Sequence, residues 1–171
     1  MKPTTDDLRV CDVLATPALS VLPEESVDTA ERRLETIGAH HLLVVQGDTL
    51  HGVLCTCDLM RGAPGTPVRV VMTPKPLVID ARSSLSFAAA VMDHRDVNCL
   101  PCHWEGSWGL LTRGDLVRAG VAERRTCVAC GAHHHVRPRT ADGTAWCRNC
   151  YDPRFSLDDV ATLYRDLGEA G

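Results

Sequence analysis

The sequence lacks both an apolar run long enough to cross a membrane and an excess of charge of one sign. A transmembrane helix needs about 20 consecutive apolar residues, and the first ten residues carry acidic side chains where a signal peptide would have an apolar stretch. The formal net charge is -4 with both signs interspersed, which disfavours a protein that coats nucleic acid or anionic lipid. We therefore expect a cytoplasmic protein with no membrane partner.

The sequence also lacks an even number of cysteines. It contains 9 in 171 residues, and an odd count does not suit a closed framework of disulfides. In a reducing compartment, cysteines serve as metal ligands, core residues or reactive thiols. Since 44% of the residues are hydrophobic, the chain has enough apolar content for a core domain with a small appendage.

An internal repeat is the most informative feature that the sequence does contain. Leu14–Pro17 recurs as Val71–Pro74, and Gly52–Leu59 recurs as Gly109–Leu116. A repeat fixes the architecture before any single residue is interpreted. The chain therefore has two equivalent halves, and two equivalent halves predict two equivalent ligand sites.

Each copy shows the same alternation of short apolar strands and amphipathic helices, in the order βαββα. The expected helices are Val27–Ile37 and Leu85–His94. The expected strands are Leu19–Leu22, Leu42–Val45 and His51–Cys55 in the first copy, and Leu77–Asp80, Cys99–His103 and Trp108–Thr112 in the second.

Changes of composition mark four regions along the chain. The repeats are expected over residues 1–62 and 68–121, and the linker between them contains Pro and Gly. Residues 122–152 are rich in Cys, His and Arg without apolar periodicity. Residues 153–171 begin with an N-cap pattern at Ser156, and Leu157, Val160, Ala161 and Tyr164 share one face of the expected helix.

The repeated motifs resemble a tandem of CBS domains, a Bateman module, over roughly residues 11–121. The resemblance rests on the Thr-Pro near each start, the βαββα order and the closing pattern Gly-hydrophobic-hydrophobic-Thr-x-x-Asp-Leu. It implies an α+β fold in which the two copies pack as a pseudo-twofold pair. It also implies two clefts that hold adenine nucleotides or S-adenosyl compounds, and a homodimer of modules.

In that resemblance, the closing Asp holds the ribose hydroxyls and the Thr lies near the phosphate. Thr112 and Asp115 match both positions, and Arg113 between them is a candidate phosphate partner. The first copy keeps Asp58 but has Cys55 in place of the Thr. We therefore expect the cleft around Asp115 to be the better ligand site, although a helix N-cap is the alternative interpretation of both aspartates.

His40 and His41 precede the second strand of the first copy, where CBS domains often place basic residues that face ligand phosphates. Asn98 and Cys99 hold the equivalent positions in the second copy and carry no charge. The alternative interpretation is that both histidines are polar residues at the edge of a strand.

Two C-x2-C pairs, Cys127 with Cys130 and Cys147 with Cys150, are separated by sixteen residues. Each pair can bend around one metal ion, and four thiolates complete a tetrahedral zinc site with no open position. The segment resembles a zinc ribbon, and a metal would fold a stretch that has no core of its own. The sequence leaves open iron, which binds to the same thiolates, and leaves His133–His135 as competing ligands.

Cys99–His103 matches the c-type haem attachment pattern, but residues three apart in a strand point to opposite faces. Cys102 is therefore expected in the core. Cys55 and Cys57 are either small apolar filler or a redox pair.

No catalytic triad or open metal site is present, so we expect no enzyme. The leading hypothesis is a regulatory module that binds an adenine nucleotide or adenosyl metabolite and signals to an unknown protein target through the ribbon. The rival is a metal or redox protein that uses the CBS pair as a scaffold. A third hypothesis is a DNA-associated regulator, because residues 121–151 carry five arginines.

Overall fold

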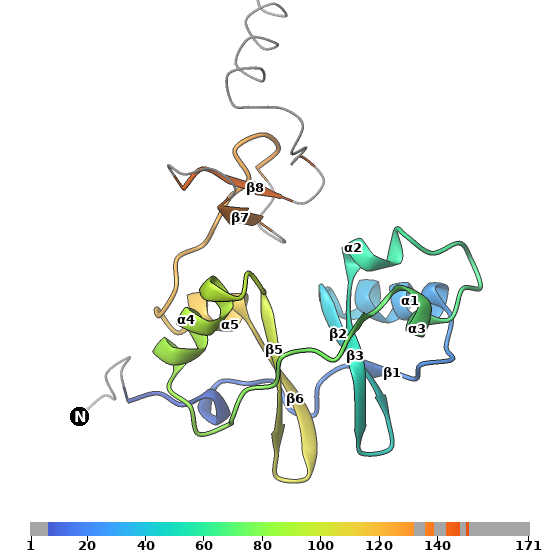
Figure 1. Cartoon of the computed structure of the whole chain (residues 1–171), viewed down its shortest axis with the longest axis horizontal. Coiled ribbons are helices and arrows are strands. Elements are labelled where there is room, and N and C mark those ends of the chain that lie inside the picture. The colour runs from blue at the N-terminus through green and yellow to red at the C-terminus, as the bar shows by residue number, and fades with distance from the viewer. Residues whose placement is uncertain (1–6, 132–135, 139–142, 148–149, 151–171) are drawn as a thin grey trace, which may run out of the picture. The chain divides into compact units, whose positions relative to one another are not determined.

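The computed structural model describes residues 7–131, 136–138, 143–147 and 150. The chain divides into two compact units, Met1–Arg124 and Arg125–Gly171. The first unit contains both repeats and has a mixed α+β fold, with helices on the outer sides of two paired hairpins (Figure 1). Within the part of the chain that the structure describes, no helix has the length and apolarity that a membrane span requires.

The first repeat forms the order that its sequence predicts. A two-residue strand, β1, pairs in parallel with β2, and β2 forms an antiparallel hairpin with β3. The elements are β1 (Ser20–Val21), α1 (Val27–Ile37), β2 (His41–Gln46), β3 (Thr49–Cys55) and α2 (Thr56–Leu59).

The second repeat has the same hairpin and helices but lacks a regular first strand. Its elements are α4 (Leu85–His94), β5 (Cys99–Trp104), β6 (Ser107–Thr112) and α5 (Arg113–Arg118). The strand expected at Leu77–Asp80 is irregular backbone, joined to β5 through one bond from the Ile79 N–H to the Pro101 carbonyl at 3.0 Å. In the first repeat, the Leu43 N–H donates to Leu19, but Pro101 stands at the matching place and has no N–H.

Serine caps set the starts of both long helices, which have the predicted bounds. The Ser26 hydroxyl accepts the N–H of Thr29 at 3.3 Å at the start of α1, and Ser84 accepts that of Phe87 at 3.1 Å at the start of α4. Helix α1 ends at Gly38 in the left-handed conformation, with φ of 68°.

The leading turn of each repeat packs into the other repeat. The turn α3 (Val68–Val71) and the strand β4 (Thr73–Pro74) precede the second repeat in sequence, yet β4 pairs with β3 of the first. Reciprocally, the 3₁₀ turn η1 (Val10–Asp12) lies in the core of the second repeat, and Ala15 forms an isolated bridge with Leu110 of β6. The two repeats therefore exchange their first turns.

The glycine that opens each closing motif makes room for this exchange. A Cβ on Gly109 would overlap the Leu14 side chain and lie 3.0 Å from the Ala15 carbonyl oxygen. A Cβ on Gly52 would lie 2.7 Å from the Thr73 carbonyl oxygen. A side chain at either position would push the exchanged segment away from the sheet.

Between the repeats, buried side chains from both hairpins form one apolar cluster. Leu43 and Val53 of the first repeat meet Leu110 of the second. The Trp108 indole N–H also donates to the Asp48 carbonyl at 2.9 Å. The repeats are thus held by packing as well as by exchange.

The second unit contains a two-stranded antiparallel ribbon, β7 (Val136–Pro138) and β8 (Ala145–Cys147). Its buried cluster consists of Cys127, Val136 and Cys147. The helix expected after Ser156, and His133–His135, lie outside the described residues.

Candidate functional site

The closing motif of the second repeat is a buried carboxylate held by its own helix start. Asp115 lies in the first turn of α5 and is 7% exposed. One of its oxygens accepts the Thr112 N–H at 2.7 Å and the Thr112 hydroxyl at 2.6 Å, while Arg118 pairs with the other. Thr112 is therefore the N-cap of α5, and Asp115, at the third position of the helix, completes a capping box instead of being the N-cap itself.

The closing motif of the first repeat has the same cap without the hydroxyl. Asp58, 3% exposed, accepts the Cys55 N–H at 3.0 Å and pairs with Arg61. Burial, aided by the Asp58 carboxylate beside it, raises the pKa of the Cys55 thiol to about 12. Cys55 is therefore a neutral, weak donor where Thr112 supplies a hydroxyl.

The two arginines beside these aspartates differ in what else they bind. Arg61 also donates to the Val71 carbonyl of the exchanged turn α3 at 2.9 Å, and its side chain is 50% exposed. The Arg118 side chain is 74% exposed, and Asp115 is its one ion-pair partner among the described residues. Asp58 is thus tied through Arg61 to the connection between the repeats, whereas the Asp115 pair is more open to solvent.

The basic residues expected near phosphate lie close to the closing motifs. Arg113 begins α5, but its guanidinium pairs with Asp93 of α4 at 2.7 Å. His41 opens β2 directly opposite Cys55, and the His40 carbonyl accepts the Thr56 N–H at 3.1 Å. The structure therefore brings His40 and His41 to the first motif and turns Arg113 toward Asp93.

Asn98 is a residue that the sequence passed over as merely uncharged. Its carbonyl accepts the Arg113 N–H at 2.9 Å, which places it beside the second motif. Asn98 Nδ2 and Arg113 Nε are buried and have no hydrogen-bond partner among the described residues. Buried donors are almost always satisfied in folded proteins, so these two unsatisfied donors distinguish the surroundings of the second motif.

The four cysteines of the C-x2-C pairs come together in the second unit. Their sulfur atoms all lie within 4.8 Å of one another, and the sulfurs of Cys130 and Cys147 are 3.7 Å apart. Tetrahedral zinc with bonds of about 2.3 Å places its sulfurs roughly 3.8 Å apart. The donor set and its spacing therefore fit a four-thiolate metal site.

Turn geometry and backbone donors prepare these sulfurs for a cation. Gly131 takes φ of 72°, and its N–H bonds to the Cys127 carbonyl at 2.9 Å. Although burial raises the pKa of Cys127, backbone donors, including the N–H groups of Cys147 and Cys130, lower it to about 6. Hydrogen bonding to Cys130 and Cys147 raises the pKa of Cys150 to about 12, because adjacent thiols cannot all ionise unless a cation compensates their charge.

Comparison with known proteins identifies the paired repeat. The model of the CBS domain matches residues 10–65 and 68–122. The chain belongs to the CBS domain family. No curated protein matches it in sequence.

Solved CBS structures share this fold. CBSX2 in complex with AMP is 30% identical, with a TM-score of 0.58 over 66% of this chain and 96% of that one. The putative acetoin utilization protein AcuB from Vibrio cholerae is 21% identical, with a TM-score of 0.61 over 67% and 90% of the two chains. The CBS pair of MJ0100, in complex with 5′-methylthioadenosine and S-adenosyl-L-methionine, is 19% identical, with a TM-score of 0.59 over 65% and 94%.

These findings confirm the tandem CBS domains and the mixed α+β fold expected from the sequence. The prediction that Cys102 is a core residue is also confirmed, since this side chain is fully buried. CBS pairs are generally regulatory modules. The ligand residues, the zinc and the partners stay predictions.

Proposed function

We propose that this protein is a regulatory CBS pair that binds an adenine nucleotide or related adenosyl compound at the second closing motif. Thr112 and Asp115 would bind the phosphate and ribose, with Arg113 and Asn98 nearby. The observation that carries this proposal is the pair of buried, unsatisfied donors on Asn98 and Arg113. Phosphate, ribose and purine atoms all offer acceptors to such groups.

The adenine class is supported by what related structures contain. CBSX2 is in complex with AMP, and the MJ0100 CBS pair is in complex with two adenosyl compounds. A carboxylate that accepts hydrogen bonds suits the diol of a ribose. A ribose would share Asp115 with Arg118, whose exposed side chain is free to swing toward a ligand phosphate.

The first motif is proposed as the weaker site. Its aspartate is held by Arg61, and Arg61 in turn holds the Val71 carbonyl, so a ligand there would compete with a contact between the repeats. His40 and His41 remain candidate phosphate partners of this site. We therefore propose one principal ligand for each chain.

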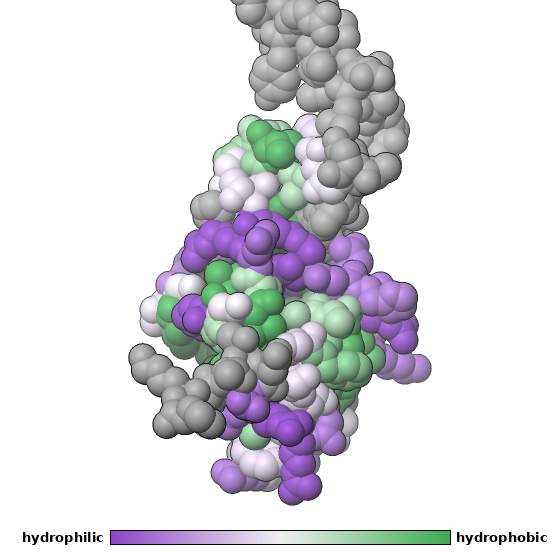
Figure 2. Space-filling model, turned by 90° about the vertical axis from the view of Figure 1, so that its left-hand side faces the viewer, coloured by the Kyte–Doolittle hydropathy of each residue, from purple (hydrophilic) through white to green (hydrophobic). Residues whose placement is uncertain are grey.

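We also propose how the module would interact with other proteins. The four-cysteine segment would hold zinc as a structural ion and present the ribbon to a protein target, and the module would form a homodimer. Exposed apolar side chains on the outer helices and their connections, such as Ile37, Met60 and Val70, offer surface for such an interface. Figure 2 shows hydrophobic and hydrophilic patches side by side on another face of the molecule. No residue is assigned a catalytic role.

Calorimetric titration with AMP, ATP and S-adenosylmethionine tests the ligand site. Asp115→Asn should weaken binding of the tightest of these roughly ten- to hundredfold, because a charged hydrogen-bond acceptor is lost. Asp58→Asn is the matched control and should change the affinity much less. An Asn replacement keeps a side-chain oxygen for the helix cap, so both variants should fold.

Asn98→Ala is a second test of the same ligand site, because it removes one unsatisfied donor and leaves Asp115 unchanged. It should weaken binding and leave the thermal stability unchanged or higher. Equal losses in Asp115→Asn and Asp58→Asn would contradict the ranking of the two sites. Absence of binding by all three compounds would contradict the proposed ligand class.

A further inference from the structure

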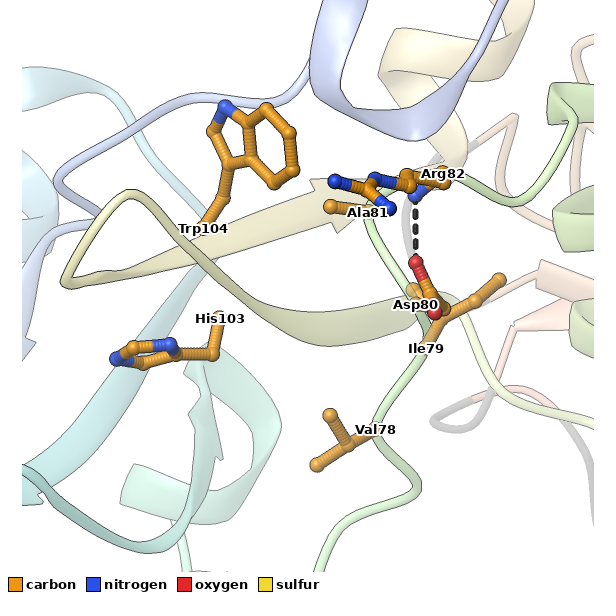
Figure 3. Close-up of a pocket in the computed structure, with 7 residues that line it drawn as sticks. All are labelled: Val78, Ile79, Asp80, Ala81, Arg82, His103 and Trp104. Carbon is orange, nitrogen blue, oxygen red and sulfur yellow. Dashed lines mark hydrogen bonds between the residues drawn. The ribbon is translucent and has the colours of Figure 1, made fainter.

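A cavity in the second repeat lies away from the closing motif. It has a volume of 410 Å³ and is lined by residues 78–82 together with His103 and Trp104 (Figure 3). Cys99 faces Thr112 across the hairpin, and His103 lies four residues further along β5, roughly 13 Å away at 3.3 Å per residue. The cavity and the proposed nucleotide site are therefore at opposite ends of the strand.

The cavity lies beyond the last backbone bond between β5 and the segment before α4. That bond runs from the Ile79 N–H to the Pro101 carbonyl. Beyond that point the segment and the end of β5 are not paired as strands, and the side chains of residues 80–82, His103 and Trp104 border the space.

The backbone of this wall is fixed before any ligand arrives. The Asp80 carboxylate accepts the Arg82 N–H at 2.7 Å, and the Arg9 guanidinium donates to the Arg82 carbonyl at 2.9 Å. The exchanged turn adds a bond from the Cys11 N–H to the Ala81 carbonyl at 2.9 Å. A wall that is already ordered loses little entropy when it binds a ligand.

The side chains around the cavity combine opposite charges with an aromatic and aliphatic surface. Figure 3 shows the rings of His103 and Trp104 across the space from Asp80, while the Arg82 guanidinium extends toward the Trp104 side. Among the described residues, the side chains of Arg82 and Trp104 form no ion pair and no ring contact. Val78 and Ile79 add apolar surface.

We propose that this cavity binds a free amino acid with an apolar side chain. The guanidinium of Arg82 would take the α-carboxylate, the Asp80 carboxylate would take the α-ammonium group, and Trp104 and Val78 would cover the side chain. A zwitterion matches the two opposite charges, which a simple anion or cation would not. The volume lies toward the lower end of the roughly 300–1,000 Å³ of small-molecule sites, as a ligand of this size requires.

The experiment compares zwitterions with derivatives that lack one charge. Calorimetry and saturation-transfer NMR would follow L-phenylalanine and L-leucine, together with N-acetyl-L-phenylalanine, which lacks the ammonium group, and L-phenylalaninamide, which lacks the carboxylate. Each derivative should bind roughly tenfold more weakly or worse than L-phenylalanine, because one charged hydrogen bond is lost.

Two variants test which residue binds each charged group of the amino acid. In Arg82→Gln, L-phenylalanine and its amide should bind equally weakly, and in Asp80→Asn the acetylated compound should no longer be disfavoured. Arg95→Gln is the matched control, because Arg95 is an exposed arginine of the same repeat at the end of α4, and it should bind as the unmodified protein does. Saturating AMP should not displace the amino acid, which keeps this result separate from the nucleotide proposal.

Three results would overturn the inference. One is the absence of binding by both L-phenylalanine and L-leucine at millimolar concentration. Another is equal affinity for the zwitterion and its derivatives, which would mean that the charges of Arg82 and Asp80 play no part. The third is an equal loss of affinity in Arg82→Gln and Arg95→Gln, which would reduce the effect to the net charge of the surface.

Discussion

At the scale of single residues, the two closing motifs differ in the side chain at the N-cap position. The Thr112 hydroxyl donates to Asp115 and accepts the Asp115 N–H at 3.4 Å, which completes a capping box. Cys55 has a sulfur at this place, with a pKa raised by burial to about 12. The helix cap therefore has its full set of hydrogen bonds in the second motif and only part of it in the first.

Exchanging these two residues should change stability in opposite directions. Thr112→Cys should lower the free energy of unfolding by about 1 kcal/mol, the typical value of a lost N-cap hydroxyl. Cys55→Thr should raise it or leave it unchanged, because the new hydroxyl can bond to Asp58. Urea denaturation followed by circular dichroism measures both, and a stabilising effect of Thr112→Cys would contradict the role given to the hydroxyl.

Sequence motifs and their spacing were enough to select some of the candidate site residues. Asp58, Asp115 and the four cysteines are recognisable because motif and spacing select them. Arg61 and Arg118 were missed, since an arginine three residues after an acidic cap is ordinary on a helix. The hydrogen bond from Arg61 to Val71 forms because the chain after the linker folds back against the first repeat. No local sequence pattern predicts that path.

At the scale of elements, the helices and hairpins were predictable and the exchange of leading turns was not. Helices α1 and α4 have the bounds that serine caps and apolar periodicity predict. In the sequence, each leading turn stands at the start of its own copy. The structure instead places β4 on β3 and Ala15 on Leu110, because long-range strand pairing follows from the three-dimensional path of the chain.

The glycines at the crossings should be sensitive to a single methyl group. Gly109→Ala should destabilise the protein by about 1 to 3 kcal/mol, because the new Cβ overlaps Leu14 and crowds the Ala15 carbonyl. Gly114→Ala is the matched control. Gly114 lies within α5 with its nearest neighbours at 3.5 Å or more from an added Cβ, so alanine should be neutral or stabilising there.

Thermal unfolding of both glycine variants, compared with the unmodified protein, checks this prediction. A Gly109→Ala variant as stable as Gly114→Ala would show that the leading turn moves aside without cost. The exchange would then be a loose contact rather than a constraint on the paired repeat.

At the scale of the whole molecule, the two units draw their stability from different sources. Residues up to Arg124 contain the apolar cores of both repeats. Among its described residues, the second unit has a small buried cluster in which two of the three buried members are metal-ligand candidates, Cys127 and Cys147. Such a short ribbon cannot fold on apolar burial alone, whereas metal binding contributes roughly 10 to 16 kcal/mol in comparable segments.

Removing the metal should therefore unfold the second unit and leave the first intact. Cys130→Ser, or a strong chelator, should abolish the one equivalent of zinc expected by elemental analysis and collapse the amide NMR signals of the ribbon. The signals of residues 7–124 and the unfolding temperature of the paired repeat should stay unchanged. Cys11→Ser is the control, because Cys11 is a half-buried thiol outside the cluster.

A colourless protein with one zinc agrees with the proposal, whereas a red protein with thiolate-to-iron absorption would assign iron to the same ligands. A metal-free protein with an ordered ribbon would contradict the metal site itself, since the sulfur spacing would then be held by packing alone.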